Sequence, residues 1–168
     1  MATSSMIARY AHDSQQFAVK YLHDKIPDRT CGECTACCTS LGVEELEKPL
    51  WQRCEHVCEA GCGIYPDRPR SCHDFTCLWL HGFFGLDKHR PDQLGLIFAM
   101  QRDRKLGAIL VAWESWPGAM SKVPGLYVLN RLSQSRFVYV FPFGEAKHRV
   151  ICGPGIEEMK KAVASHEI

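Results

Sequence analysis

The sequence predicts an α+β protein, in which a loop-rich, cysteine-dense lobe precedes a small, mainly antiparallel sheet with flanking helices. Two observations support this prediction. Nine of the ten cysteines lie between Cys31 and Cys77, in a segment that glycine and proline interrupt repeatedly. After Pro91 the pattern changes to β-branched and aromatic runs, which are typical of strands. With 168 residues, the chain can bury a core without cross-links.

The chain divides into three parts that we expect to form one compact domain. Residues 1–29 hold an N-terminal amphipathic helix, 30–81 a cysteine-cluster metal-binding region, and 82–168 a small α+β lobe packed on it. Apolar residues between positions 6 and 25 repeat at three- and four-residue intervals, which predicts the first helix. Pro27 then ends that helix.

Regular structure is expected mostly in the third part. Strands are predicted at residues 94–100, 108–113, 137–141 and 149–152, with a charged turn at 101–105. A helix is predicted from position 121 to about 132, with Ser121 near its cap and Pro124 in its first turn. A last helix should run from Pro154 to about residue 165. In the cysteine region we expect only a short helical turn at Val43–Lys48.

Charge and hydropathy exclude several classes of partner. The net charge is +1 with both signs interspersed, so we expect no nucleic acid or anionic membrane as main partner. No apolar stretch is long enough to span a membrane, and the N-terminus lacks the features of a signal peptide. We therefore expect a cytoplasmic protein. Because disulfides rarely persist there, the cysteines indicate metal binding, with a disulfide-stabilised module as the alternative.

The cysteine segment opens with Cys31-Gly-Glu-Cys34-Thr-Ala-Cys37-Cys38. Cysteines separated by two residues can wrap one ion, because the turn between them directs both sulfurs inward. Three cysteines at this spacing also match the start of a bacterial ferredoxin cluster motif. The motif therefore predicts a metal but leaves zinc and an iron–sulfur cluster open. Adjacent side chains usually diverge, so Cys37 and Cys38 either serve two neighbouring centres or Cys38 packs in the core.

Further cysteines follow downstream, at Cys54, Cys58, Cys62, Cys72 and Cys77. Nine thiols would fill two four-ligand sites with one left over, or hold one four-iron cluster with additional structural thiols. His56 and His73 are candidate ligands or hydrogen-bond partners of the ligands. Three arginines in this segment either offset the negative charge of the centre or are solvated: Arg53, Arg68 and Arg70. The distant Cys152 is most simply a buried thiol.

Two stretches resemble the YkgJ-type cysteine-cluster proteins, bacterial proteins described as a zinc- or iron-chelating domain. They are Cys31-x2-Cys34-x2-Cys37-Cys38 and the Gly-Cys-x-Ile-Tyr-x-x-Arg-Pro-x-x-Cys run from Gly61 to Cys72, which continues through Phe75, Cys77 and Trp79 to Leu80. The resemblance covers about residues 30–81. It implies chelation by Cys31, Cys34, Cys37, Cys38, Cys62, Cys72 and Cys77, with Cys54 and Cys58 completing the set.

The resemblance has a further implication and one departure. A related cluster occurs in flagellin lysine N-methylases, which implies that iron–sulfur binding is possible within the group. Family members usually carry arginine after the cysteine matched by Cys72, whereas this chain has His73. The change removes a fixed cation and favours His73 as a ligand. Independently of the family, we expect an apolar shell around the sulfurs, formed by Ile64, Tyr65, Phe75, Trp79 and Leu80.

Three classes of function fit these observations. The first is a metal-binding protein whose cluster is structural, which we favour. The second is an enzyme, methyltransferase-like or redox, but no Gly-rich cofactor signature or catalytic residue can be named, and Glu55 and Glu59 are expected to be surface charges. The third is metal handling, in which surplus thiols assist exchange. Four aromatic residues of the third part either contact a protein partner or form core, and we favour core: Trp113, Trp116, Tyr139 and Phe141.

Overall fold

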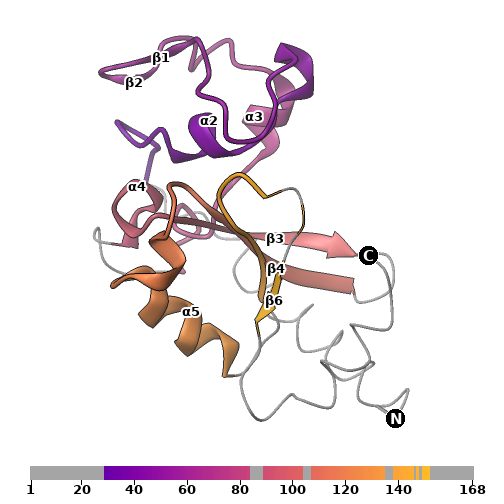
Figure 1. Cartoon of the computed structure of the whole chain (residues 1–168). Helices are drawn as coiled ribbons and strands as arrows, with labels where there is room; N and C mark the ends of the chain where they lie inside the picture. The colour runs from indigo at the N-terminus through magenta and orange to yellow at the C-terminus, as the bar shows by residue number, and fades with distance from the viewer. Residues whose placement is uncertain are drawn as a thin grey trace.

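The computed structural model describes residues 29–83, 89–103, 107–134, 138–145, 147 and 149–151 (Figure 1). These residues form an α+β fold, as predicted, with a four-stranded sheet and a separate two-stranded hairpin. The helices predicted at 6–25 and 154–165, and Cys152, lie outside the described residues. None of the described helices is long and apolar enough to cross a membrane.

The larger sheet has the order β3-β4-β5-β6. Its strands are β3 (Leu96–Asp103), β4 (Gly107–Glu114), β5 (Val138–Phe141) and β6 (Arg149–Ile151). The β3/β4 and β5/β6 pairs are antiparallel, which agrees with a mainly antiparallel sheet. The β4/β5 pair is parallel, because helix α5 (Gly125–Ser133) crosses over between these two strands.

Two predicted boundaries in this part are wrong. Residues 101–103, expected in a turn, extend β3, because β3 and β4 keep pairing as far as Asp103 and Gly107. Ser121 does not cap α5. It ends a short 3-10 helix, η3 (Ala119–Ser121), and Pro124 occupies the cap position of α5 instead.

The start of β3 also differs from the expectation. Leu94 ends helix α4 (Pro91–Leu94), and Gly95 separates this helix from the strand. Gly95 has a φ of 79°, and a Cβ there would lie 2.5 Å from the Cβ of Ala119. This position therefore requires glycine for both its conformation and its close contact.

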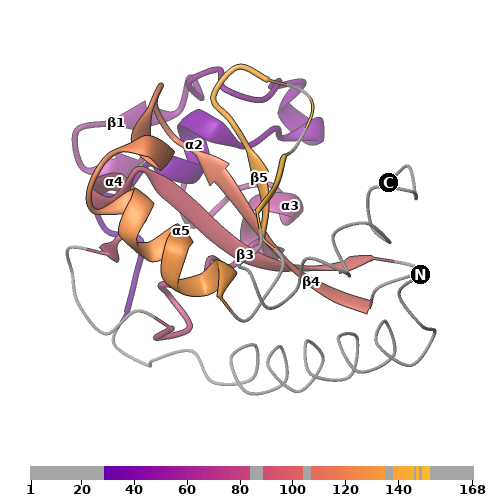
Figure 2. The ribbon, with the colours of Figure 1, turned by 60° about the horizontal axis from the view of Figure 1, so that its bottom comes forward.

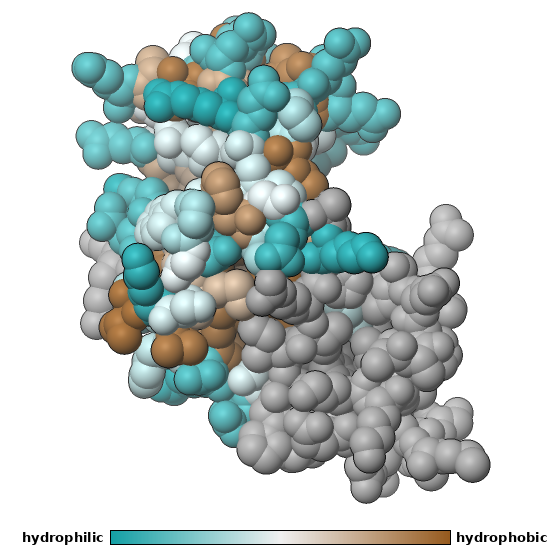
Figure 3. All heavy atoms as spheres, viewed as in Figure 1, coloured by the Kyte–Doolittle hydropathy of each residue, from teal (hydrophilic) through white to brown (hydrophobic). Residues whose placement is uncertain are grey.

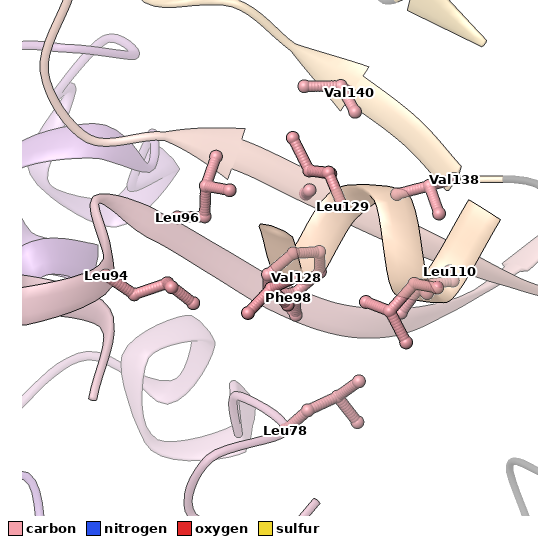
Figure 4. Packing of buried hydrophobic residues seen from close by; sticks show 11 residues of the cluster. Leu78, Leu94, Leu96, Phe98, Leu110, Val128, Leu129, Val138 and Val140 are labelled. Carbon is pink, nitrogen blue, oxygen red and sulfur yellow. The ribbon is translucent and has the colours of Figure 1, made fainter. Parts of the chain in front are cut away.

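The sheet buries apolar side chains on both faces. On one face, residues such as Phe98, Leu110 and Val140 pack against α5 in a cluster seen in Figure 4. On the other face, Ile97 and Trp113 belong to a second cluster that includes residues of the cysteine region. Successive strand residues point to opposite faces, which explains how neighbours enter different clusters. Figure 2 shows α5 and the cysteine region on opposite sides of the sheet.

The cysteine region contains only short elements, as its glycines and prolines predict. They are α2 (Ala36–Ser40), η1 (Glu44–Leu46), β1 (Val57–Cys58), β2 (Gly61–Cys62) and α3 (Arg70–Asp74). The 3-10 helix η1 confirms the helical turn expected at Val43–Lys48. Helix α2, the β1/β2 hairpin and α3 were not predicted, because elements this short leave no periodic pattern.

The chain joins the cysteine region to the sheet through residues 77–79, which run beside β3. The N–H of Leu78 donates to the carbonyl of Phe98 at 2.7 Å. Leu78 belongs to the cluster on the α5 side, whereas Cys77 and Trp79 belong to the opposite cluster. This strand-like alternation places Cys77 directly over the sheet face that the cysteine region covers.

Candidate metal centre

A cavity of about 480 Å³ lies between the cysteine region and the sheet, where Ile97 and Trp113 contribute to its wall. Nine cysteines are described, all with free thiols, and eight of them line this cavity. The eight are Cys31, Cys34, Cys37, Cys38, Cys54, Cys62, Cys72 and Cys77. The fold therefore gathers thiols that are up to 46 positions apart (77 − 31) around one space.

The first four thiols come from one turn and one helix. The N–H of Cys34 donates to the carbonyl of Cys31 at 2.9 Å, which closes the turn before α2. Helix α2 then carries Cys37 and Cys38, whose sulfurs lie 4.0 Å apart and share a hydrogen bond. The expectation that these side chains diverge is wrong. Their spacing is close to the roughly 3.8 Å edge of a tetrahedron of zinc-bound sulfurs.

Backbone contacts bring the middle cysteines to this helix. The N–H of Cys54 donates to the carbonyl of Cys38 at 2.9 Å. Cys62 lies on β2, next to Gly61, which has a φ of 113°. A Cβ on Gly61 would lie 2.4 Å from the carbonyl oxygen of Gly32, so only glycine allows the hairpin to approach the Cys31–Cys34 turn this closely.

Cys72 is placed by the short helix α3. The carboxylate of Glu45, in η1, accepts hydrogen bonds from the N–H and the hydroxyl of Ser71, at 2.9 and 2.6 Å. These bonds hold the first turn of α3 against η1. They also lower the pKa of the exposed Glu45 carboxyl. Cys72 follows Ser71 directly and lines the cavity.

The structure does not bring Cys58 into the cavity. Its side chain is exposed, and its sulfur lies 4.0 Å from where a Cβ of Gly63 would stand. The residue sits on β1, whose partner β2 carries Cys62 to the cavity instead. Cys58 is thus set apart from the other eight, which the spacing of the sequence alone does not reveal.

The two histidines occupy different positions. His56 does not line the cavity, and its Nε2 lies 3.6 Å from the carboxylate of Glu55, which is exposed. His73 does line the cavity, although its side chain is 69 % exposed and its Nδ1 lies 3.3 Å from Asp74. Of the two, only His73 stands where it could reach a metal in the cavity.

Burial raises the pKa values of the thiols nearest the sheet. Burial and, to a smaller extent, the neighbouring Asp92 carboxylate together raise the pKa of Cys34 to about 12. A hydrogen bond to Cys38 raises the pKa of Cys37, and so do burial and the charges of Cys31 and Cys34. Burial likewise raises the pKa of Cys77, with a contribution from Cys31. Each of these shifts favours the protonated thiol over the thiolate.

The pKa values of three further thiols are shifted, two upward and one downward. Burial raises the pKa values of Cys62 and Cys72, and charges on Cys38 and Cys54 raise both further. The hydrogen bond from Cys37 lowers the pKa of Cys38 to about 7, and the nearby Lys48 ammonium lowers it as well.

Lys48 is a cation that the sequence interpretation missed. It is 7 % exposed, and its Nζ donates to the carbonyls of Leu41 and Pro49. Burial lowers its pKa, an effect that the charges of Cys54, Cys38, Cys37 and Cys72 oppose. A single lysine followed by proline carries no sequence signal for such a position.

The three arginines proposed from sequence lie farther from the thiols or have other contacts. Arg53 is exposed, and Arg70 is exposed and pairs with Asp74 at 3.2 Å. Arg68 lines the cavity, but its guanidinium stacks on the Tyr65 ring at 4.0 Å. Arg68 nevertheless lowers the pKa of Cys62, and the buried Lys48 lowers that of Cys38.

The expected apolar shell is present around the thiols. Ile64, Tyr65, Phe75, Trp79 and Leu80 all line the cavity. Phe75 packs edge-on against Trp113, with ring centroids 6.3 Å apart. These rings exclude water from part of the cavity, which strengthens electrostatic interactions within it.

Two features of the cavity suit a metal bound by thiolates. One is its set of sulfur donors, and the other is a buried polar group without a hydrogen-bond partner among the described residues. The indole N–H of Trp79, which is 7 % exposed, has no hydrogen-bond partner among the described residues. A buried donor needs an acceptor, and a metal-bound thiolate is one. In the described part of the chain, however, no three His, Cys, Asp or Glu side chains already converge on a single point at ligand distance. Binding would require thiol side chains to turn inward.

Comparisons with models of known protein families, with curated proteins and with solved structures found no match to this chain.

Proposed function

We propose that this protein binds zinc or iron, the latter as an ion or in an iron–sulfur cluster, through its cysteine cluster, and that the metal is structural. The observation that supports this is the cavity, which eight thiols line. Each thiol loses its proton when a metal binds, and the binding free energy adds to folding, by about 10 kcal/mol per zinc site. The metal would thus stabilise a region that contains few regular elements of its own.

We also propose a family and a cellular compartment for this protein. The resemblance of residues 30–81 to the YkgJ-type proteins is consistent with chelation, and we propose membership of that family. We also propose a cytoplasmic location, because a reducing compartment keeps thiols available for metal.

A second candidate function is metal handling. It is favoured by Cys72, which lies on a short helix without a buried residue, between the exposed Ser71 and His73. Cys62 also lies on a short element, and the residue after it, Gly63, is exposed. An incoming ligand could reach these thiols without unfolding the sheet. An enzymatic role lacks comparable support, because no residue of the described chain can be given a catalytic role.

The test is to purify the protein without oxygen and to measure its visible absorption with its iron, sulfide and zinc content. A brown protein that absorbs near about 400 nm, with equal iron and sulfide, would identify an iron–sulfur cluster. A colourless protein with about two zinc ions per chain would identify zinc sites. Only trace metal, with the thiols intact, would contradict the proposal.

A further inference from the structure

We infer that the cavity also binds an uncharged, apolar small molecule of about one or two rings. This inference goes beyond the proposed metal binding, because it depends on the apolar walls of the cavity and needs no assignment of thiols to a metal. Three features of the described residues support it: the size of the cavity, the composition of its walls and its opening to solvent.

The cavity is larger than a metal centre requires. Its volume is about 480 Å³. An ion takes no more space than a water molecule, about 30 Å³. Even the eight atoms of a four-iron, four-sulfur core would take about 240 Å³ at that size, which is half of the cavity. An apolar space of about 150 Å³ is enough to hold one benzene molecule, so room for a small organic molecule remains.

The first apolar wall belongs to the sheet. Ile97 on β3 and Trp113 on β4 are buried members of the cluster on this face, and both line the cavity. Leu41 and Phe75 pack against the same cluster and line the cavity beside them. Because the cluster holds these side chains in place, this wall is already formed before a ligand arrives.

The second apolar wall comes from the cysteine region. It is formed by four residues that are absent from both apolar clusters of the described chain: Val43, Leu46, Leu50 and Ile64. The N–H of Val43 donates to the carbonyl of Lys48 at 2.8 Å, and the reverse bond measures 3.0 Å. The backbone therefore holds Leu46 at the cavity, although its side chain has no place in either core cluster. An apolar ligand would remove both walls from water at once.

The charges around the cavity favour an uncharged ligand. Among the described residues that line it there is no Asp or Glu to pair with a cation. Its arginine, Arg68, stacks on the Tyr65 ring at 4.0 Å and donates to the carbonyl of the same residue at 2.5 Å. A charge carried into this apolar space would lack a partner, and burying an unpaired charge costs free energy.

The cavity is open to ligands from solvent. Leu50 and Tyr65 both line it and are exposed at the surface. His73, on the short helix α3, also lines the cavity and is exposed. A small molecule can therefore enter between these residues while the sheet and its two apolar clusters stay intact.

The experiment uses the full chain as purified under reducing, oxygen-free conditions, with its metal content measured on the same sample. The probe is 6-propionyl-2-(dimethylamino)naphthalene, an uncharged two-ring dye whose emission moves to shorter wavelength when it leaves water. Titration should saturate at about one dye per chain, with this shift in emission. Leu46→Trp adds bulk to the second wall and should weaken dye binding at least about tenfold.

A second variant and a matched control complete the test. Leu50→Glu places a charge at an exposed position of the second wall and should also weaken binding about tenfold. Val123→Glu makes the same kind of change at an exposed residue outside the lining of the cavity, and should alter the affinity by less than about twofold. Should Leu46→Trp fail to fold, Leu50→Glu decides against this control.

Three results would overturn the inference: dye binding that does not saturate, wild-type affinity in the two wall variants, or equal weakening in Val123→Glu and Leu50→Glu. The last result would place the dye on the outer surface. Metal content is a separate measurement, so trace metal would contradict the proposed function while the dye titration still tests this inference.

Discussion

In the sheet, β3 and β4 pair over eight residues each and bury apolar side chains on both faces, whereas the longest described helices of the cysteine region have five residues. The sheet is stabilised by its own packing, with residues such as Leu96, Ile97 and Val138 fully buried. The cysteine region instead surrounds a cavity lined by thiols. Under the proposed function, the sheet folds by burial of apolar side chains, whereas the cysteine region is expected to need its metal.

The largest effect expected is that of metal removal. Stripping the metal should cost about 10 kcal/mol per site and abolish amide protection in α2 and the β1/β2 hairpin. The amides of β3 and β4 should keep theirs, because the cluster between the sheet and α5 contains no thiol. Hydrogen exchange measured by mass spectrometry, with and without metal, tests this. Equal loss in both regions would show that the sheet also depends on the metal.

The next largest effect is expected from the sheet itself. Phe98→Ala removes a ring that is 1 % exposed and should lower the free energy of unfolding by about 3–5 kcal/mol. Denaturant titration of the metal-loaded protein measures the loss. Apolar side chains are visible at the surface in Figure 3, and Val123 is an exposed one, at 81 %. Val123→Ala is the control and should change little. A metal content per folded chain that falls in Phe98→Ala would contradict the separation of the two regions.

A smaller effect is expected at Glu114, which connects several segments. Its carboxylate is 3 % exposed and accepts hydrogen bonds from the N–H groups of Met120 and Phe143, at 2.8 and 2.9 Å. Its carbonyl accepts a bond from the Trp51 indole at 3.1 Å. Glu114→Ala should cost about 1–3 kcal/mol in urea unfolding, because two backbone N–H groups lose the buried carboxylate that accepts their hydrogen bonds.

Glu114→Gln serves as the control for that substitution. It keeps the shape of the side chain and one acceptor oxygen, so a smaller loss of unfolding free energy is expected. If the two variants were equally stable, the hydrogen bonds from Met120 and Phe143 would contribute nothing to this part of the fold.

The smallest effect expected compares two glycines in the cysteine region. Gly61→Ala forces a Cβ against the carbonyl of Gly32 and should cost about 1–3 kcal/mol, with a lower metal content. Gly32→Ala also has positive φ, at 50°, but no atom within 4 Å of its Cβ, so it should cost about 1 kcal/mol and keep the metal. Thermal melts and metal content per chain distinguish the two. Equal effects would show that the close contact of the hairpin does not matter.

The predictions from sequence differ in accuracy between the sheet and the cysteine region. The strands of the sheet were predicted to within a few residues, because continuous apolar runs mark β3 and β4, whose side chains are buried on both faces. The five residues expected as an apolar shell do line the cavity. The cap of α5 was placed wrongly at Ser121, because a 3-10 helix intervenes where a local pattern favours an N-cap.

The sequence by itself determined the α+β class, the region where thiols gather and the short helical turn at η1, because these depend on composition and local spacing. Only the tertiary structure decided that Cys58 stays outside the cavity, that Lys48 is buried beside Cys38 and Cys54, and that the sulfurs of Cys37 and Cys38 meet. Those outcomes depend on contacts between distant segments, such as Gly61 against Gly32 and Leu78 beside Phe98. Such contacts arise from the packing of the whole chain and leave no periodic trace in the sequence around each residue.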